Sequence, residues 1–299
     1  MRTRGFVRHV IFPLLTAMIW GSAFVFQSTA ADHMGPFTFN FCRGAVGCVS
    51  LLAVVIPRLA AGKRSGRPMD RRGILVGVLC GAAIAAASNL QQVGISISGA
   101  GKSGFVTSLY IVLVPVLGLL LGKKTGGVVW VSVAAAVAGL YLLCVKGDFG
   151  VSLGDAVLLG CALLFALHII LVDRFAADMD GFELSCLQFA VMAAISAVGM
   201  FLFEKPSLSD IRPGLGSILY VGVVSSAVAY TLQILAQQGG DPARVSLLFS
   251  LEAVFAALAG AVFLHERMSA REYAGCALML IAVALPQVVS IVKSKEHTH

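Results

Sequence analysis

Ten long apolar segments constrain the fold of this chain more than any other feature. Each holds about twenty mostly apolar residues, the length that an α-helix needs to cross a hydrocarbon core about 30 Å thick. The strands of a membrane β-barrel would instead alternate apolar and polar residues over about ten positions. We therefore predict an all-α membrane protein with ten transmembrane helices, at residues 10–30, 36–57, 73–93, 103–122, 126–145, 154–173, 181–203, 214–237, 244–264 and 273–292.

The composition excludes a water-soluble protein. Hydrophobic residues make up 58% of the 299 residues and charged residues 12%, whereas soluble domains hold about 45–50% and about 25%. A soluble enzyme, a disordered chain, a coiled coil and a secreted disulfide scaffold are excluded on this ground. The seven cysteines lie within the predicted spans and none forms a CxxC pair, so we expect no metal site, no disulfide framework and no cofactor.

Basic residues in the loops predict the orientation of the chain. Fifteen of the 22 Lys and Arg residues fall on the side of the N-terminus and six on the other side, and it is cytoplasmic loops that carry an excess of Lys and Arg. We expect a multi-pass protein of a bacterial inner (cytoplasmic) membrane with both termini in the cytoplasm. This bias accounts for the net charge of +7 without binding of nucleic acid. Cleavage of a signal peptide near Ser28–Ala30 would leave nine spans, so we expect the first segment to be retained.

The chain divides into two similar halves, residues 1–146 and 147–299, with five predicted spans each. Trp20-Gly21 in the first half matches Phe165-Ala166 in the second, and Leu113–Val116 matches Leu251–Val254 at a similar spacing. An odd number of spans per repeat forces the second repeat to insert upside down, a design that is typical of secondary transporters with a site near the membrane midplane. Small residues four positions apart predict close helix packing at Gly77/Gly81, Gly118/Gly122, Ala135/Gly139 and Ala256/Gly260.

Arg43 and Glu252 are the formally charged side chains deep in the predicted spans. A charge at the bilayer centre costs about 2.5–3.5 kcal/mol on insertion scales, so its presence indicates a functional site. The two differ in depth by about 8 Å, so direct pairing needs tilted helices or extended side chains. Arg43 is either a structural brace or an anchor for a substrate carboxylate. Glu252 is either a proton- or cation-coupling group, since a low-dielectric site favours a neutral carboxyl, or a structural carboxylate that braces helix backbone.

Neutral polar and aromatic side chains within the spans predict a polar central cavity. Amide side chains in a membrane helix are expected to face the bundle interior and not the lipid. Trp20 either walls the cavity or packs in the core. His168 lies at a similar depth to Glu252 and either titrates near neutral pH or is a neutral histidine bonded to a neighbour. The expected cavity residues are Trp20, Asn40, Arg43, Asn89, Gln92, His168, Tyr230 and Gln233, with Glu252 as a possible proton-coupling group.

Several motifs carry a family resemblance that covers nearly the whole chain. They are Trp20-Gly-Ser-Ala-Phe24, Arg43, Gly104-Phe-Val-Thr-Ser-Leu-Tyr-Ile-Val-Leu-Val-Pro115, Ala229-Tyr-Thr-Leu-Gln233 with Ala236-Gln237, and Ser250-Leu-Glu-Ala-Val-Phe-Ala-Ala257 followed by Leu264-His-Glu-Arg267. On these motifs the chain resembles the drug/metabolite transporter superfamily, specifically its EamA-like ten-helix exporters. The resemblance implies export of small metabolites, amino acids or drug-like compounds. Ala253 stands where the family usually has proline, which removes the usual cause of a kink in the ninth span, and His265 stands where it usually has glycine.

These features predict a secondary transporter that exports small solutes by alternating access, and not an enzyme. An intramembrane enzyme is a less favoured alternative, because the spans lack a His-Glu-x-x-His motif and paired aspartates. Nothing resembles the ring of charges or the carbonyl filter of a channel. A nucleotide-sugar carrier of the same superfamily would need several cations for its phosphates, whereas Arg43 alone favours neutral, zwitterionic or cationic solutes. The expected partners are a small-molecule substrate and the lipid bilayer, and a monomer is compatible with the sequence.

Overall fold

The computed structural model describes residues 5–145, 152–263, 265 and 267–296. Within these residues ten helices are long and apolar enough to cross a membrane, which confirms the predicted number of spans. The first five spans consist of η1 (Val7–Ile11) with α2 (Phe12–Ala31), α3 (Pro36–Ala60), α4 (Arg71–Ser108), α5 (Tyr110–Leu120) and α6 (Gly127–Cys144). Gly99 has a φ of 76° inside α4, so the chain turns there, and the last part of α4 joins α5 to form span 4.

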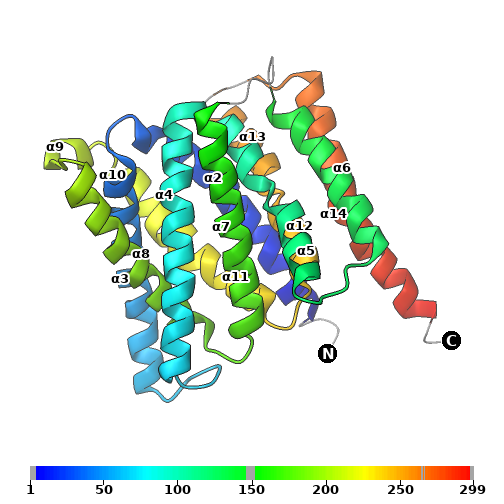
Figure 1. Cartoon of the computed structure of the whole chain (residues 1–299), viewed down its shortest axis with the longest axis horizontal. Helices are drawn as coiled ribbons and strands as arrows, with labels where there is room; N and C mark the ends of the chain where they lie inside the picture. Colours follow the sequence, from blue (N-terminus) through cyan, green and yellow to red (C-terminus); the bar gives the residue numbers. More distant parts are fainter. Residues whose placement is uncertain (1–4, 146–151, 264, 266, 297–299) are drawn as a thin grey trace.

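The second half of the chain supplies spans 6 to 10. They consist of α7 (Leu153–Phe175), α8 (Gly181–Phe203), α10 (Leu215–Leu219) with η2 (Tyr220–Ala229) and α11 (Tyr230–Gln237), α12 (Pro242–Phe249) with α13 (Glu252–Phe263), and α14 (Ala270–Glu296). A short helix, α9 (Leu208–Ile211), lies between spans 7 and 8. The α3–α4 loop and the described ends of the chain lie at one end of the bundle, and α9 lies at the other (Figure 1).

Contacts between the spans follow two inverted five-helix repeats. If each span is exchanged with its counterpart five spans away, the contact between spans 3 and 6 becomes a contact between spans 8 and 1. Both contacts exist: α4 packs against α7, and α2 packs against η2 and α11. The same exchange maps α5–α7 onto α12 and α13 against α2. The pairs α3–α8 and α6–α14 map onto themselves and are also in contact. The predicted boundary between the repeats, after residue 146, lies outside the described residues.

Small residues bring several helices into close contact, as the sequence predicts. A Cβ atom on Gly139 of α6 would lie 2.9 Å from the carbonyl oxygen of Gly275 on α14, so the two backbones pack directly against each other. Gly81 of α4 packs in the same way against the Gln188 carbonyl oxygen of α8, and Gly77 packs against the side chain of Leu187 on α8. The pair Gly118/Gly122 was wrongly expected to form such a face. Gly122 has a φ of 81° and ends its helix.

Spans 4 and 9 are both interrupted near the middle. Span 4 breaks at Leu109, between α4 and α5, and span 9 breaks at Ser250 and Leu251, between α12 and α13. Both breaks contain tightened i→i−3 turns, with the N–H of Leu109 donating to Val106 and the N–H of Leu251 donating to Leu248. Span 9 therefore bends without the proline that Ala253 replaces. The break coincides with these tightened turns, and the N–H of Ala253 is present and donates to the Ser250 carbonyl oxygen at 3.2 Å.

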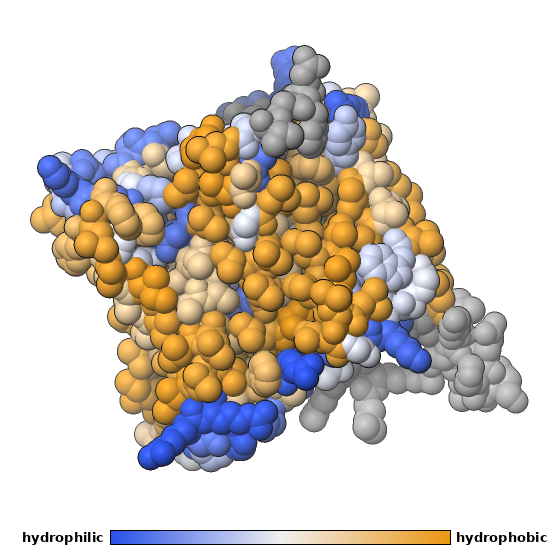
Figure 2. Space-filling model, viewed as in Figure 1, coloured by the Kyte–Doolittle hydropathy of each residue, from blue (hydrophilic) through white to orange (hydrophobic). Residues whose placement is uncertain are grey.

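The surface of the bundle carries a broad apolar band between two polar ends (Figure 2). Large exposed side chains such as Val49, Phe201 and Val262 belong to the spans. A soluble protein rarely exposes such a continuous apolar area. The ten apolar spans and this band show that the chain is an integral multi-pass membrane protein.

Asp180 fastens two loops together at the end of the bundle that holds the chain termini. Its carboxylate caps the N-terminus of α8 by accepting from the backbone N–H of Phe182 at 2.9 Å. The same carboxylate accepts from the backbone N–H of Ser65 at 2.8 Å and from Arg58 at 3.1 Å. Burial alone would raise the pKa of Asp180, but hydrogen bonds from Ser65, the start of α8 and Arg58 together hold that pKa below its ordinary value.

Replacing Asp180 with Ala should lower the free energy of unfolding by about 1–2 kcal/mol, since it removes a helix cap together with a link between loops. A carboxyl with a depressed folded-state pKa stabilises fully above its unfolded pKa of about 3.9, and this stabilisation is lost as the pH falls through the folded value. Thermal unfolding of the purified protein should show a Tm difference that is constant above about pH 5 and shrinks below about pH 4. The exposed neighbour Asp178 provides the control, Asp178→Ala. An equal loss in both variants would contradict this role.

Candidate functional site

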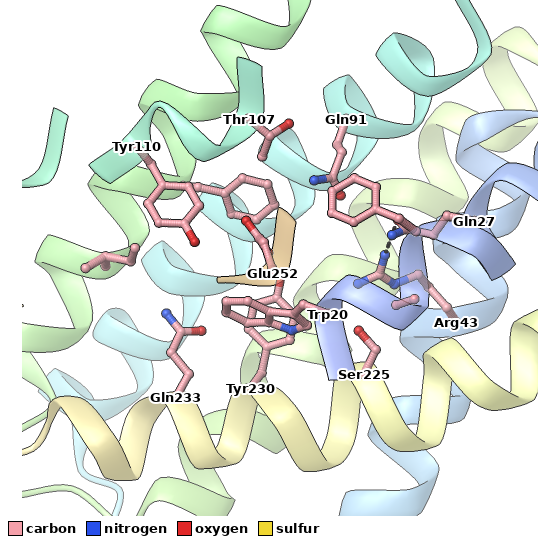
Figure 3. A pocket seen from close by; sticks show the side chains of 14 residues that line it. Trp20, Gln27, Arg43, Gln91, Thr107, Tyr110, Ser225, Tyr230, Gln233 and Glu252 are labelled. Atoms are coloured by element: carbon pink, nitrogen blue, oxygen red, sulfur yellow. Dashed lines mark hydrogen bonds between the residues drawn. The ribbon is translucent and has the colours of Figure 1, made fainter. Parts of the chain in front are cut away.

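A cavity lies inside the bundle between the two repeats (Figure 3). Spans 1, 2, 3, 4, 6, 8 and 9 all contribute to its wall. Arg43 and Gln27 lie together on one side, Gln233 and Tyr110 lie on the other, and Trp20 and Glu252 lie between them (Figure 3). The lining residues are Trp20, Ala23, Phe24, Gln27, Arg43, Gln91, Thr107, Tyr110, Phe165, Ile169, Ser225, Tyr230, Gln233 and Glu252.

The two interrupted spans place Glu252 and its partners on the cavity wall. Glu252 is the first residue of α13, directly after the break in span 9, and its side chain is buried. Ser108 and Tyr110, which flank the break in span 4, face it. The Ser108 hydroxyl donates to Glu252 Oε1 at 3.3 Å, and Tyr110 lines the cavity beside this carboxyl. Discontinuous helices therefore bring polar groups from both repeats to one point, as in other membrane transport sites.

Gly21 allows α2 to lie directly against α13 beside this carboxyl. A Cβ atom on Gly21 would lie 2.5 Å from the carbonyl oxygen of Glu252 and 2.5 Å from Cβ of Phe255. No side chain fits in that space, so the backbone of α2 touches the start of α13. This contact fixes Trp20, the preceding residue, next to the cavity.

Arg43 is buried on the side of the cavity across from Gln233 and Tyr110, and its hydrogen-bond partners are neutral. Its Nη1 donates to Gln27 Oε1 at 3.2 Å, and its Nε donates to the Ser226 hydroxyl at 3.3 Å. Among the described residues no ion pair joins Arg43 to Glu252. The cavity thus contains one cation and one carboxyl that bind separate neutral groups.

Aromatic rings form much of the remaining wall. The ring of Trp20 lies 4.8 Å from that of Tyr230 and 5.3 Å from that of Phe249, measured between centroids. The indole Nε1 of Trp20 is buried and has no hydrogen-bond partner among the described residues. Buried indole N–H groups usually find a partner. A cavity occupant with an acceptor atom would supply one.

The structure places four of the predicted cavity residues elsewhere. Asn40 and Asn89 hydrogen-bond to each other at 3.1 Å, and Asn89 also donates to Ser196, so these two amides join α3, α4 and α8. Gln92 donates to the Gln27 carbonyl and lines a second pocket. His168 is buried behind Gln233 and does not line the cavity. Trp20, Arg43, Tyr230, Gln233 and Glu252 do line it.

His168 has a partner at each ring nitrogen. Gln233 Nε2 lies 3.4 Å from Nδ1, and because an amide nitrogen only donates, Nδ1 acts as an acceptor. Nε2 then carries the proton and donates to Gln188 Oε1 at 3.0 Å. This assignment follows from the hydrogen-bond network and corresponds to the neutral histidine bonded to a neighbour. No hydrogen bond joins the side chains of His168 and Glu252 among the described residues, so the structure offers no direct route for the two to share a proton.

Five polar cavity residues were missed by the sequence reasoning, namely Gln27, Gln91, Thr107, Tyr110 and Ser225. Gln27 and Gln91 carried a usable signal, since both are amides within apolar spans. Thr107, Tyr110 and Ser225 carried none. Ser and Thr hydroxyls are common in membrane helices because they can hydrogen-bond to the backbone of their own helix. Tyr110 reaches the site because it directly follows the break in span 4.

The cavity is narrow in this conformation. Its volume is about 30 Å³, which leaves room for about two water molecules. Ligand pockets are usually about 300–1,000 Å³. Any organic solute that binds here requires a rearrangement of the surrounding helices. Within the described residues no group of three or more His, Cys, Asp or Glu side chains could hold a metal ion.

Comparison with known proteins identifies the family. A model described as the EamA-like transporter family matches the chain twice, over residues 8–145 and 152–286. The chain belongs to the EamA-like transporter family. The two matches fall on the two five-helix repeats, as expected for an EamA-like chain with an internal duplication.

Relatives of this EamA-like chain are also described as transporters. An uncharacterized transporter of Archaeoglobus fulgidus is 29% identical over 274 residues, which cover 91% of this chain and 83% of that protein. The uncharacterized transporter YwfM of Bacillus subtilis is 25% identical, with 97% of this chain and 96% of that protein covered. One crystal structure with 18% identity matches at a TM-score of 0.80 over 94% of this chain and 96% of that chain, and it shows the same fold.

His265 is one of the two positions at which this chain departs from the EamA-like pattern, and it lies in a turn. It has a φ of 54°, a left-handed conformation that costs about 1–2 kcal/mol for a residue with a Cβ. Glycine, which EamA-like proteins usually carry here, adopts this conformation without strain. The turn after span 9 therefore carries backbone strain that a glycine at position 265 would remove.

The position of Trp20 generates a direct test of the cavity wall. Trp20→Ala should weaken binding of the transported solute while leaving the yield of folded protein close to that of the wild type, because the ring faces the cavity and is only partly buried. Trp130→Ala, in α6 and away from the cavity, is the matched control. Solute affinity and yield are measured together on the purified variants. A large fall in yield with unchanged affinity would show that Trp20 serves as core packing.

Proposed function

We propose that this protein is a secondary transporter that exports small organic solutes across a bacterial cytoplasmic membrane by alternating access. One observation carries the proposal: a polar and aromatic cavity lies between two inverted repeats, at the breaks of spans 4 and 9. The family and the described relatives point to transport, and we expect no enzymatic activity. We propose that residues 1–146 and 147–299 form the two repeats.

Alternating access is supported by the difference between the two ends of the bundle. At the end with the chain termini, Gln238 of the loop after α11 donates to the carbonyl oxygens of Ala176 and Met179 at 3.0 and 2.8 Å, and it accepts from Arg8 at 2.9 Å. His9 bonds to the Ala236 carbonyl at 2.8 Å. These contacts link the N-terminal segment to the segments that follow spans 6 and 8, whereas a pocket of about 380 Å³ lies at the end that holds α9.

The solute class follows from the charges that line the cavity. Arg43 is the cation among the described lining residues, and Glu252 is the carboxyl. The phosphates of a nucleotide sugar would favour several cations, so the nucleotide-sugar alternative is weaker. Neutral, zwitterionic or cationic solutes with an apolar or aromatic part suit the rings of Trp20 and Tyr230. Arg43 would then bind a solute carboxylate or serve only as a brace, the two alternatives that the sequence left open.

Uptake of a panel of labelled solutes into proteoliposomes, with and without a pH gradient, tests the proposal. The protein should accumulate or exchange at least one neutral, zwitterionic or cationic solute faster than empty liposomes. Trp20→Ala should reduce that transport and Trp130→Ala should not. Transport of nucleotide sugars alone would support the alternative carrier, and no solute movement beyond that of empty liposomes would contradict the proposed function.

The sidedness of the bundle gives a separate prediction. The bias of Lys and Arg favours a cytoplasmic location for the α3–α4 loop and both termini. In a background without native cysteines, Lys63→Cys should react with an impermeant thiol reagent only from the cytoplasmic side, and Lys205→Cys only from the outside. The same labelling should place His299 inside and Asp148 outside, both of which lie beyond the described residues. Labelling in the reverse pattern would overturn the orientation and therefore the assigned export direction.

Proton coupling through Glu252 is the most specific part of the proposal. A coupled carrier needs one group that takes up a proton on one side and releases it on the other, and Glu252 faces the cavity beside the Ser108 hydroxyl. Glu252→Gln should abolish transport driven by a pH gradient but spare equilibrative exchange, because Gln resembles the protonated carboxyl in shape and charge. The matched control is Glu252→Asp, which keeps a carboxyl at this position and should retain transport driven by a pH gradient.

The two transport modes separate the roles of Glu252. Gradient-driven transport that persists in Glu252→Gln would show that coupling lies elsewhere. Loss of exchange as well would show that Glu252 is a solute ligand or a structural carboxylate. A wild type that is indifferent to pH would indicate facilitated diffusion.

A further inference from the structure

A second pocket opens at the α9 end of the bundle, apart from the central cavity. Its volume is about 380 Å³, within the range of about 300–1,000 Å³ that ligand pockets occupy, whereas the central cavity holds about 30 Å³. We call it the vestibule. It lies between the loop that joins α2 to α3, the segment from Glu204 to Asp210, and one face of α4 that carries Gln92 and Ser96.

Negative charge dominates the vestibule. Three carboxylates line it together with one lysine and one histidine, namely Asp32, Glu204 and Asp210 with Lys205 and His33. Glu204 is already engaged, because it accepts from the backbone N–H groups of Phe37 and Thr38 at 2.9 and 2.8 Å and so caps α3. Asp32 follows the C-terminus of α2, where the helix dipole adds partial negative charge. Asp32 and Asp210 are exposed, so both are accessible to a cation.

The floor of the vestibule carries a buried acceptor with no partner. The Gln92 amide is oriented by its Nε2, which donates to the Gln27 carbonyl oxygen at 2.9 Å. Its Oε1 is therefore the free end, and it has no hydrogen-bond partner among the described residues although Gln92 is 1% exposed. A buried acceptor without a partner is unfavourable. A ligand with an N–H donor in the vestibule would satisfy it.

We propose that the vestibule is a binding site for an organic cation that carries N–H donors, such as a protonated amine. Asp32 and Asp210 attract the positive charge, and one N–H donates to Gln92 Oε1. A bare metal ion fits less well, since no cluster of three or more metal-ligating side chains exists within the described residues. The size of the pocket also exceeds what a metal ion needs and suits an organic molecule.

This site is separate from the central cavity. Gln91 lines the central cavity and Gln92 lines the vestibule, and the bond from Gln92 to the Gln27 carbonyl lies between the two spaces. The vestibule therefore binds its cation whether or not the central cavity transports a solute. The proposal goes beyond the proposed function and does not depend on it.

Equilibrium dialysis of the purified full chain against radiolabelled 1,4-diaminobutane at low ionic strength tests the site, because salt screens exposed charges. Asp32→Asn combined with Asp210→Asn should weaken binding by about three- to tenfold. Asp178→Asn, which removes an exposed carboxylate at the opposite end, should leave binding unchanged. Gln92→Met, which keeps the side-chain length but removes the acceptor, should weaken binding by about tenfold or more.

Several outcomes would overturn the proposal. Equal binding in the wild type and in the Asp32/Asp210 double variant would show that the vestibule is not the site, and this result stands even if Gln92→Met does not fold. A loss in Trp20→Ala as large as that in the double variant would move the site to the central cavity. The hexamethylated form of 1,4-diaminobutane, which carries the same two charges but no N–H, should bind more weakly than 1,4-diaminobutane, and equal binding would remove the role of Gln92. Displacement of the diamine by Mg²⁺ at equal concentration would indicate a site for inorganic cations.

Discussion

The need to pair every backbone polar group inside a hydrocarbon layer governs this structure. Lipid offers no hydrogen bonds, so irregular backbone is tolerated only where protein or a polar cavity surrounds it. The breaks in spans 4 and 9 obey this rule. Leu251 is buried and Leu109 is half-buried against the core, and tightened turns satisfy their N–H groups. Because the breaks occur where the two repeats meet, they also place Tyr110 and Glu252 on the cavity wall. The same constraint that builds the helices therefore locates the site.

Burial of two charges is the second feature on which the site depends. Arg43 and Glu252 are both almost fully buried, yet neutral groups and not opposite charges hold them. Removing a charge from water is costly unless hydrogen bonds replace its hydration. A direct pair would neutralise both groups and fill the cavity. Separate partners keep the guanidinium and the carboxyl available to an occupant. Gln27 has a further role, because its side chain holds Arg43 while its backbone holds Gln92 at the vestibule.

Much of the fold could be predicted from the sequence, and less of the site. The ten spans follow from the length of the apolar segments, and each predicted segment lies on a described helix. Trp20, Arg43, Tyr230, Gln233 and Glu252 line the cavity in the structure, because polar or aromatic groups in apolar spans face the interior. Asn40, Asn89 and His168 also face the interior, but Asn40 and Asn89 bond to each other and Asn89 to Ser196, while His168 bonds to Gln188 and Gln233. Polarity predicts burial in the bundle and cannot distinguish a cavity wall from a link between helices.

The sequence by itself determined the number of spans, the duplication and the identity of the buried charges, because each depends on the hydrophobicity and order of residues along the chain. Tertiary structure decided where span 9 breaks, since Ser250 and Leu251 carry no proline or glycine signal. It also decided that Gln91 faces the cavity while Gln92 faces the vestibule. Neighbouring residues on a helix point about 100° apart. Which of the two spaces each one meets therefore depends on how α4 is rotated against its neighbours, and that rotation is set by packing between helices distant in the chain.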